Sequence, residues 1–543
     1  MHSKIINFGV HFTKRRSFAQ YLNQLQRFPT QTVQQHTNSS MKNTLTAVLA
    51  STLTIPTLAQ IPGHQKPLAY PQLKTSECTK AGGCTSTTTN VVIDSNWMWT
   101  HKKGTYTNCF SGNAWDPTLC PDGKTCAANC ALDAGDVNDY ANTYGVRATD
   151  DALSLNFVTK TQYGTNVGSR TFLMKDATTY KMFKLKNREF TFTVDDSTMP
   201  CGINGALYFS AMQEDGGLSE YPGNTAGAAY GTGYCDAQCP HDIKFINGEA
   251  NVEGWNPSPA DPNAGSGKYG TCCTELDIWE ANMDATQLTP HVCRDPAGTQ
   301  YRCQGDSCGD DASNERYDGL CDKDGGDWNP FRLGQTNFWG PGSQYTVDST
   351  KPVTVVTQFI THDGTDTGDL SEIKRFYIQN GKQINSTAWN GYDSITDDYI
   401  TAAKTKFNDT KSFEPRGGMK RLGDVMESNG MVLVMSIWDD HAVNMVWLDA
   451  TDPPGGTALG DKRGRCSEQS GVPATLEKEH PNSKVVFSDI RSGEIGSTTG
   501  NTPGPSPGPS GCPGGSLSAC MALCPSTPPA AYKACVQDCV NRC

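Results

Sequence analysis

Three carboxylate side chains lie within six consecutive positions of the segment CCTELDIWEANMD, residues 272–284, and they are Glu275, Asp277 and Glu280. Cleavage of a glycosidic bond needs such a set, because one carboxylic acid protonates the departing oxygen while a second carboxylate attacks the anomeric carbon or activates water. Like charges on neighbouring strand side chains repel each other, so this density is unusual on one face of a strand. The pattern alone leaves three interpretations open: an acidic surface strand, a metal site, or a catalytic pair with a supporting carboxylate.

Strand periodicity alone does not bring all three acids together. Side chains alternate along a strand, so Glu275 and Asp277 share one face whereas Glu280 has the opposite parity. A β-bulge or a strand end would be needed to turn Glu280 into the same cleft, and such irregularities gather at active sites. The apolar Leu276, Ile278 and Trp279 between the acids indicate a strand packed into the fold.

Four tryptophans could supply flat stacking surfaces near such a site. Trp97 and Trp99 share strand parity in IDSNWMWTH, and Trp438 and Trp447 bracket WDDHAVNMVW. Sugar rings present C–H faces that stack on indoles, so repeated tryptophans suit a neutral glucan. For any one tryptophan taken alone, burial in the core is the better interpretation.

The composition favours a loop-rich all-β domain with a neutral or cationic ligand. The 543 residues carry a formal net charge of -12 with only 19% charged residues, so we expect no nucleic-acid partner. The 54 glycines and 31 prolines are typical of many turns. Strands are predicted at 188–195, 351–359 and 431–438, and the long loops 213–272 and 293–332 could wall a groove.

The cysteines predict a secreted protein. There are 22, sixteen between Cys78 and Cys466 and six between Cys512 and Cys543. This density is unusual in a reducing compartment, and the spread of the first group argues against a single metal cluster. We therefore expect eleven disulfides.

Composition divides the chain into five segments. Residues 41–59 read as a signal peptide cleaved after Ala59, too short and too rich in threonine for a membrane span. Residues 1–40 precede it, so either translation starts at Met41 or the leader is unusually long. A β-sandwich domain is expected at 60–495, a Pro/Gly/Ser linker at 496–511 and a six-cysteine module at 512–543.

The last module has the cysteine spacing of a helical hairpin. Cys520 and Cys524 are four residues apart, as are Cys535 and Cys539, so each pair would share one helix face. A module on a linker can raise the effective concentration of an enzyme at a solid substrate. Its single aromatic, Tyr532, leaves polysaccharide binding and protein or cell-wall tethering equally open.

Several segments together resemble glycoside hydrolase family 7, the cellobiohydrolases and endoglucanases. They include CCTELDIWEANMDATQLTPHVC, VVIDSNWMWTH, PCGINGALYFSAM, GGDWNPFRLG and MVLVMSIWDDHAVNMVWLD, and the similarity runs from about Cys78 to Ile495. The resemblance implies a concanavalin-like jelly roll of two large antiparallel sheets, with disulfide-braced loops that roof a cellulose-binding tunnel or cleft. The rival interpretation is a glucan-binding lectin or wall protein on the same fold.

The resemblance also implies roles for the acidic segment. Glu275 would be the nucleophile, Glu280 the general acid/base, Asp277 a hydrogen-bond partner of the nucleophile, and His291 a residue beside the leaving-group sites. The reaction would retain the anomeric configuration through a covalent glycosyl-enzyme. Nothing in the sequence calls for a cofactor or a catalytic metal.

The same resemblance assigns binding residues along a cellulose chain. Trp99 would be the entrance platform, Trp97 and Trp438 interior platforms, and Trp447 the platform near the product. Polar contacts are implied for Asn204, Tyr208, Tyr234, Asp236, Gln238, Lys244, Arg170, Arg316, Asp324, Asp327, Arg332 and Arg463. Salt bridging between loops is the alternative for the charged members of this set.

The family pattern implies a specific disulfide pairing. The pairs are Cys78–Cys84, Cys109–Cys130, Cys120–Cys126, Cys201–Cys466, Cys235–Cys273, Cys239–Cys272, Cys293–Cys321 and Cys303–Cys308. Two further family bridges have lost both partners, with Gly63 and Ala131 at one pair of positions and Gly326 and Ile400 at the other.

Within the family that the chain resembles, long loops imply exo action with release of cellobiose from reducing chain ends, and an endoglucanase is the alternative. We expect a monomer. Ala312 and Ala442 stand where many tunnel enzymes place facing tyrosines, so we expect a looser roof and shorter processive runs. Asn385 and Asn408 begin glycosylation motifs.

Overall fold

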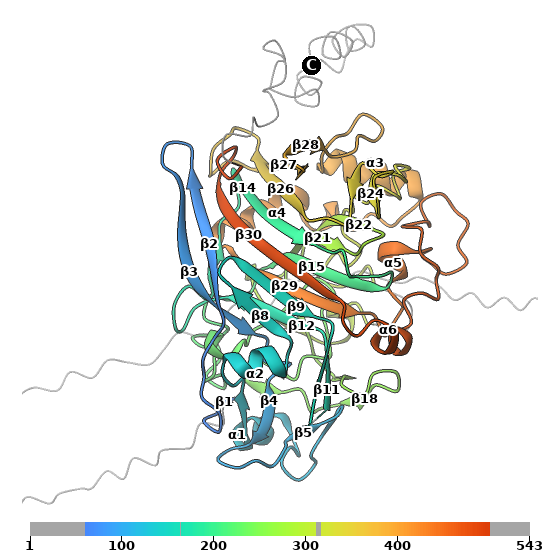
Figure 1. The fold of residues 1–543 in the computed structure, drawn as a ribbon. Coiled ribbons are helices and arrows are strands. Elements are labelled where there is room, and N and C mark those ends of the chain that lie inside the picture. The colour runs from blue at the N-terminus through green and yellow to red at the C-terminus, as the bar shows by residue number, and fades with distance from the viewer. Residues whose placement is uncertain (1–59, 163, 311–315, 500–543) are drawn as a thin grey trace, which may run out of the picture. The chain divides into compact units, whose positions relative to one another are not determined.

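The main feature of the protein is a 15-stranded sheet that folds back on itself as two packed layers (Figure 1). This computed structural model describes residues 60–162, 164–310 and 316–499. The inner layer follows the order β22 (Thr286–His291), β21 (Glu275–Ala281), β15 (Ile203–Ser210), β29 (Met431–Asp439), β12 (Ser169–Leu173) and β3 (Gly83–Ile93). The outer layer continues through β2 (Gln72–Thr79), β30 (Lys484–Glu494), β14 (Arg188–Asp195), β26 (Val353–Thr361), β27 (Leu370–Gln379) and β28 (Lys382–Asn385).

Aromatic side chains fill the space between the two layers. Phe190 on β14 meets Phe209 on β15 edge to face with ring centroids 5.0 Å apart, and Phe192 meets Trp279 on β21 at 6.0 Å. The long strand β3 pairs with β2 through its first part and with β12 through its last, so it joins the layers. The predicted all-β sandwich is confirmed.

The three predicted strands correspond to β14, β26 and β29. On β14 the polar Glu189 and Thr191 are buried as well as the apolar face, because the C-terminal end of the domain covers them. The carboxylate of Glu189 accepts hydrogen bonds from the backbone N–H groups of Gly496 at 3.0 Å and Thr498 at 3.2 Å. The folded domain therefore extends past the expected boundary at residue 495.

Short elements surround the sandwich. The helices are α1 (Gly123–Asn129), α2 (Val137–Asn142), α3 (Asp397–Phe407), α4 (Gly418–Ser428), α5 (Val446–Asp449) and α6 (Pro473–Glu479), with 3-10 turns η1 (Ala228–Tyr230), η2 (Gly305–Ser307) and η3 (Glu414–Arg416). Joined to the large sheet are β8 (Val146–Thr149), β9 (Ala152–Asn156) and β13 (Met182–Phe183). A separate sheet holds β1 (Ile61–Pro62), β7 (Cys130–Asp133) and β4 (Trp99–Lys102).

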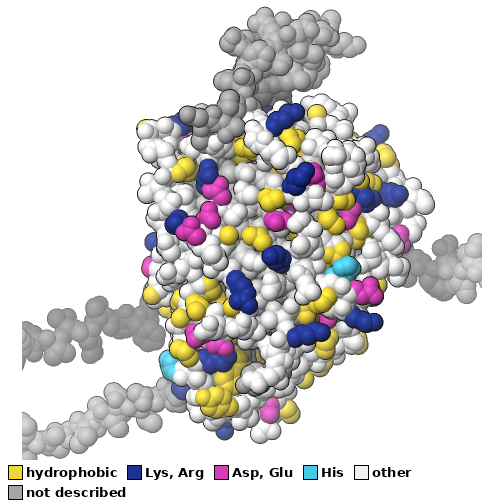
Figure 2. Space-filling model, viewed as in Figure 1, with side chains coloured by type: hydrophobic (Ala, Val, Ile, Leu, Met, Phe, Trp, Pro, Cys, Tyr) yellow, Lys and Arg dark blue, Asp and Glu magenta, His cyan; other side chains and the backbone are white. Residues whose placement is uncertain are grey.

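Two-stranded pairs stiffen the long loops. They are β5 (Phe110–Ser111) with β6 (Ala114–Trp115), β10 (Val158–Thr161) with β11 (Gly164–Val167), β16 (Phe245–Ile246) with β17 (Glu249–Ala250), β18 (Asn256–Pro257) with β19 (Gly265–Ser266), β20 (Gly270–Cys272) with β23 (Tyr301–Cys303), and β24 (Trp339–Gly340) with β25 (Val347–Asp348). On the face shown in Figure 2, charged side chains of both signs are interspersed. Within the described part of the chain, no helix combines the length and apolar character that a membrane crossing requires.

All eight disulfides implied by the family pattern are present in the described residues. At each of the two lost disulfides, the residues that replace the two cysteines lie close to each other. A Cβ placed on Gly326 would lie 2.3 Å from Cδ1 of Ile400, and the N–H of Gly63 bonds the carbonyl of Leu132, next to Ala131, at 2.7 Å. Residues 1–40, the signal segment 41–59, and the six-cysteine module lie outside the described residues, as does the linker from residue 500 onward.

Candidate active site

One face of the inner layer gathers side chains from five neighbouring strands. Directly paired residues of adjacent strands point to the same side, so the strand register shows which side chains meet. Arg170 pairs with Ser436, Trp438 pairs with Asn204, and Glu275 pairs with His291. These predicted site residues therefore share the face that is turned away from the core.

A β-bulge in β21 returns Glu280 to this face. Against β22, Asp277 pairs with Thr289 and Glu280 pairs with Gln287, so β21 takes three steps where its neighbour takes two. The same extra residue shows against β15. Trp279 turns into the core while Glu280 turns back beside Asp277. The irregularity that the parity argument required is present.

A buried arginine from the opposite layer holds the bulge. Arg375 on β27 donates a hydrogen bond from Nη2 to the carbonyl of Ile278, and its Cζ lies 5.8 Å from the ring centroid of Trp279. A bulge breaks the strand ladder locally, so its backbone groups need partners from elsewhere. Sequence reasoning missed Arg375, because a single arginine in a strand gives no sign of the carbonyl it reaches.

Glu280 is a buried carboxyl with two amide donors. Nδ2 of Asn204 lies 3.0 Å from Oε1, and Nε2 of Gln287 lies 2.8 Å from Oε2. Burial raises the pKa of Glu280, and the two donors oppose this rise because they stabilise the ionised form. Gln287 is a site residue that the sequence analysis did not single out, although it lies in the quoted segment.

Glu275 lies at the start of β21, and its Oε2 accepts a hydrogen bond of 3.0 Å from the backbone N–H of Ala237. It also shares a hydrogen bond with Asp277. Burial, Asp277 and Asp236 raise the pKa of Glu275, and burial and Glu280 raise the pKa of Asp277. Carboxyls this close in a buried site cannot all ionise, so the Glu275–Asp277 pair holds a proton.

His291 continues this chain of hydrogen bonds. Its Nδ1 lies 2.8 Å from the carbonyl oxygen of Asp322, which can only accept, so Nδ1 carries a proton. Its Nε2 lies 3.1 Å from Oδ2 of Asp277, and that contact also needs a proton. Both contacts of Asp277 are satisfied when the protonated acid donates to an ionised Glu275 and Nε2–H of His291 donates to Asp277.

The same three residues are also the group that a metal ion could use. The ligand atoms of Glu275, Asp277 and His291 all lie within 4.8 Å of one another. Those atoms already face each other as hydrogen-bond partners, which favours proton sharing over coordination.

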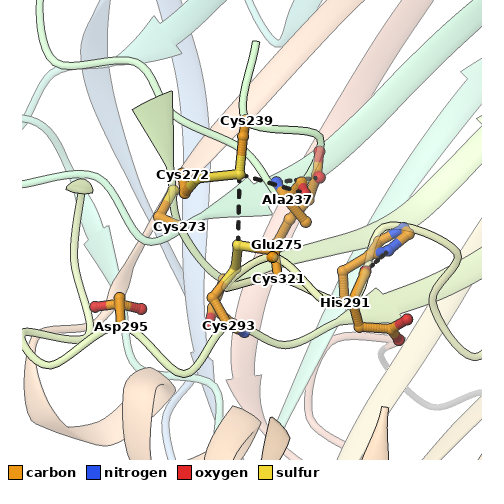
Figure 3. The surroundings of a disulfide bond; sticks show 12 residues. Ala237, Cys239, Cys272, Cys273, Glu275, His291, Cys293, Asp295 and Cys321 are labelled. Atoms are coloured by element: carbon orange, nitrogen blue, oxygen red, sulfur yellow. Dashed lines mark hydrogen bonds between the residues drawn. A yellow bond between two sulfur atoms is a disulfide. The ribbon is translucent and has the colours of Figure 1, made fainter. Parts of the chain in front are cut away.

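Two disulfides fix the loop that carries the Ala237 donor. The adjacent Cys272 and Cys273 precede β21 and bond to Cys239 and Cys235. Figure 3 shows Ala237 facing Glu275 close to the Cys239–Cys272 bridge, with the Cys293–Cys321 bridge next to it. The CC of the sequence motif therefore clamps the backbone donor against the buried carboxylate.

The four tryptophans proposed as platforms differ from most others in burial. Trp97, Trp99, Trp438 and Trp447 are half-buried, whereas Trp115, Trp279, Trp328 and Trp339 are buried in the core. Trp438 and Trp447 stack with ring centroids 6.0 Å apart. The core interpretation therefore fits the second group better than the first.

A polar chain runs along the strands toward Glu275. The guanidinium of Arg170 lies 3.3 Å from the ring centroid of Tyr234, whose hydroxyl lies 2.8 Å from that of Tyr208 and donates to Asp236 at 2.7 Å. Asp236 in turn raises the pKa of Glu275. The structure brings these predicted residues together beside the acids.

The remaining predicted polar residues form three separate groups. Arg316 pairs with Asp324 at 2.8 Å and approaches Gln238 at 3.4 Å. Lys244 donates to the carbonyl of Asn96 at 2.7 Å, and burial lowers its pKa to about 8.

The third group centres on Asp327. It pairs with Arg332 at 2.7 Å and with Arg463 at 3.5 Å. The Arg316–Asp324 and Arg332–Asp327 pairs lie within the loop 293–332, the Arg463–Asp327 pair joins that loop to a second one, and Lys244 contacts a backbone carbonyl. Ala312 lies outside the described residues.

The chain is similar to known proteins over most of its length. The sequence model of Glycosyl hydrolase family 7 matches residues 62–499. A cellobiohydrolase of that family from Daphnia pulex is 51% identical, with 81% of this chain and 100% of that chain covered and a TM-score of 0.79. A cellobiohydrolase from Melanocarpus albomyces, solved with cellotetraose, is 44% identical over 80% and 99% of the two chains, with a TM-score of 0.74. The endocellulase EGI of Humicola insolens is 36% identical over 80% and 100%, with a TM-score of 0.66.

Proposed function

Because the chain belongs to glycosyl hydrolase family 7, we propose that it is a secreted cellulase that hydrolyses β-1,4-glucosidic bonds. The observation that carries the proposal is the β21 bulge, which places the buried Glu280 on the same face as Glu275 and Asp277. A protein that only binds glucan has no use for a carboxyl whose pKa is raised beside a second buried carboxylate.

The proposed mechanism is a double displacement. Glu280, kept protonated by burial, donates its proton to the glycosidic oxygen while the ionised Glu275 attacks the anomeric carbon. A glycosyl-enzyme forms on Glu275 and the leaving chain end departs with the proton of Glu280. Glu280 then removes a proton from water, which attacks the same carbon from the opposite face and releases Glu275, so the configuration is retained.

Asp277 and His291 act on Glu275 by holding protons. The Asp277 hydroxyl donates to Glu275 and stabilises its negative charge, while His291 lowers the pKa of Glu275. Asp277 is thereby prevented from becoming a second charge beside the nucleophile. His291 is a positioning residue in this scheme.

The substrate is a neutral cellulose chain that stacks on the half-buried tryptophans. Trp438 and Trp447 form one stacked pair. Trp99 is proposed as the entrance platform and Trp97 as an interior platform. The polar groups around Arg170, Asp236, Lys244 and Arg332 offer donors and acceptors for sugar hydroxyls.

Exo action with release of cellobiose from reducing ends is the finer proposal. The long loops 213–272 and 293–332 support it, as does the similarity to two cellobiohydrolases. The endoglucanase alternative is supported by the similarity to the Humicola insolens endocellulase. Eight disulfides in the described residues and exposed asparagines at both glycosylation motifs support secretion.

The test is a product profile on insoluble cellulose for the wild type and for Glu280→Gln, which keeps the shape of the side chain but not its proton. Dominant cellobiose from the wild type and collapsed activity in the variant would support the exo proposal. Mixed oligomers with a rapid fall in viscosity would favour an endoglucanase. Intact binding without hydrolysis by either protein would overturn the enzyme proposal in favour of a glucan binder.

A further inference from the structure

Two loops of the domain meet at His441. Its Nδ1 lies 3.0 Å from the carbonyl oxygen of Ala260, in the loop between β18 and β19. Its Nε2 lies 3.4 Å from Oε1 of Glu477 on α6 and 3.7 Å from Oδ1 of Asp439 at the end of β29. Figure 1 shows β18 beside α6. We call these contacts of His441 the loop clasp.

The loop between β18 and β19 is anchored at a second point by Asn113. The Nδ2 group of Asn113 donates to the backbone carbonyls of Ser258 at 2.9 Å and Asp261 at 3.0 Å. The backbone carbonyl of Asn113 accepts a hydrogen bond from Nε1 of Trp255 at 2.8 Å. Asn113 belongs to the turn between β5 and β6 and does not titrate. The β18–β19 loop is therefore held at two points, by Asn113, which does not ionise, and by His441, which can.

The clasp is connected to the stacked tryptophan pair. Trp438 precedes His441 on the same segment and Trp447 follows it. Asp440 accepts from Nε1 of Trp447 at 3.0 Å and from the backbone N–H groups of Ala442 at 2.8 Å and Val443 at 3.0 Å. A shift of His441 would therefore move Trp438 and Trp447, on which the sugar chain is proposed to stack.

We propose that His441 is a specificity-determining residue that closes the β18–β19 loop over the bound glucan beside Trp438 and Trp447, so that this enzyme retains its chain when the clasp is protonated and releases it more readily when the clasp is deprotonated. This inference rests on the proposed function. It also qualifies the expectation of a loose roof: Ala442 offers no aromatic ring, but the neighbouring His441 makes a polar contact with a different loop.

The charges around the ring set the direction of the pH effect. Asp439, Glu477 and Asp261 face the clasp from β29, α6 and the β18–β19 loop. The buried Oδ2 of Asp439 has no hydrogen-bond partner among the described residues. Burial, with Glu477 and Asp261, raises the pKa of Asp439 to about 7, although His441 lowers it.

The raised pKa of Asp439 means that Asp439 binds a proton when the clasp is closed and releases it when the clasp opens. Closure is therefore favoured below the ordinary pKa of an aspartate and is lost as the pH rises through about 7. Above that range Asp439 is ionised beside the carboxylates of Glu477 and Asp261. Repulsion between these groups then favours opening of the loop.

The experiment measures the ratio of soluble to insoluble reducing ends on cellulose between about pH 5 and pH 8. A processive enzyme gives a high ratio, because each captured chain yields many soluble products. We expect the wild-type ratio to fall about threefold or more as the pH rises, the effect of losing one net hydrogen bond. His441→Ala should show the low ratio throughout, because it removes the contact with the β18–β19 loop. Asp439→Asn, which cannot ionise, should show a ratio that does not depend on pH.

The control is His362→Ala, which removes an exposed histidine elsewhere on the surface and should follow the wild-type curve. Hydrolysis of a short soluble cellobioside is measured in parallel, and thermal unfolding shows that each variant is folded at each pH. A flat wild-type ratio, or a His441→Ala curve equal to the wild type, would overturn the inference while cellobioside hydrolysis persists. Loss of cellobioside hydrolysis in the wild type would instead overturn the proposed function.

Discussion

The two amide donors on Glu280 oppose the effect of its burial. Burial favours the neutral acid, whereas each amide favours the carboxylate, so the pKa of Glu280 depends on how many donors remain. Asn204 comes from β15 and Gln287 from β22, the two strands that flank β21. The strength of the proposed acid is therefore set by both neighbours of its strand.

Replacing Gln287 by leucine should raise the pKa of Glu280 and move the alkaline limb of kcat/KM to higher pH. Glu280 must be protonated to act as the acid, so a higher pKa extends activity upward. The shift should be about one pH unit, the equivalent of one hydrogen bond to a charged group. The measurement is a pH profile on a soluble cellobioside. Gln383→Leu on β28 is the control, and an alkaline limb that stays in place or moves down would contradict the prediction.

Asparagine at position 277 should preserve more activity than alanine. The amide of Asp277→Asn can donate to Glu275 and accept from His291, as the protonated acid does, whereas Asp277→Ala does neither. Because the protonated acid and the amide both donate to Glu275, the acidic limb of kcat/KM should stay near its wild-type position in Asp277→Asn and move to higher pH in Asp277→Ala. Equal loss in both variants, or an acidic limb that stays in place in Asp277→Ala, would count against the proton assignment.

At this scale the sequence predicts residue types better than their partners. The spacing of Glu275, Asp277 and Glu280 shows that carboxylates gather, but which donor reaches which oxygen depends on strands far apart in the chain. Gln287 stands seven residues after Glu280 and meets it only because a hairpin brings β22 back. The backbone donor of Ala237 carries no residue-type signal.

The bulge in β21 is the element on which the site depends. Without the extra residue, Glu280 would point into the core and Trp279 toward the site. The parity of the sequence shows that a bulge is needed, but the residue that supports it comes from β27 in the other layer. A side chain that crosses the sandwich cannot be assigned from either strand alone.

Changing Arg375 to methionine should weaken both stability and catalysis. Methionine fills similar space but leaves the carbonyl of Ile278 without its donor, at a cost of about 1–3 kcal/mol. The relaxed bulge should also misplace Glu280, so kcat on a soluble cellobioside should fall in protein that is still folded. Chemical denaturation and kinetics measure the two effects separately.

The control for this change is Arg188→Met on β14, which breaks the half-exposed pair with Asp366. Such pairs contribute about 0–1 kcal/mol, so the control should lose little stability and no kcat. If Arg375→Met lowered stability while kcat stayed at the wild-type value, the bulge would not need this arginine to orient Glu280.

At the scale of the whole molecule, the eight disulfides of the described residues and the segment 496–498 complete the folded domain. Spacing alone does not determine the disulfide pairing, since sixteen cysteines allow a very large number of pairings, whereas the family resemblance implies one. The paired loss at Gly326 and Ile400 is explained by packing, because Ile400 now fills the space beside the glycine. The linker composition of GSTTG predicts a domain end at residue 495, whereas Ser497 and Thr498 are buried.

Glu189 makes that domain end a testable feature of stability. Its fully buried carboxylate accepts from Gln358, Gly496 and both donors of Thr498, so residues 496–498 satisfy a charge on the outer layer. A chain ending at residue 495 should unfold at a lower temperature than one ending at residue 499, with a loss of about 3 kcal/mol for a buried charge deprived of donors. Glu189→Gln should recover part of this loss in the shorter chain, because a neutral amide costs less to leave unpaired, and should not stabilise the longer one. Equal unfolding temperatures for the two chains would mean that the fold is complete at residue 495, as linker composition alone suggested.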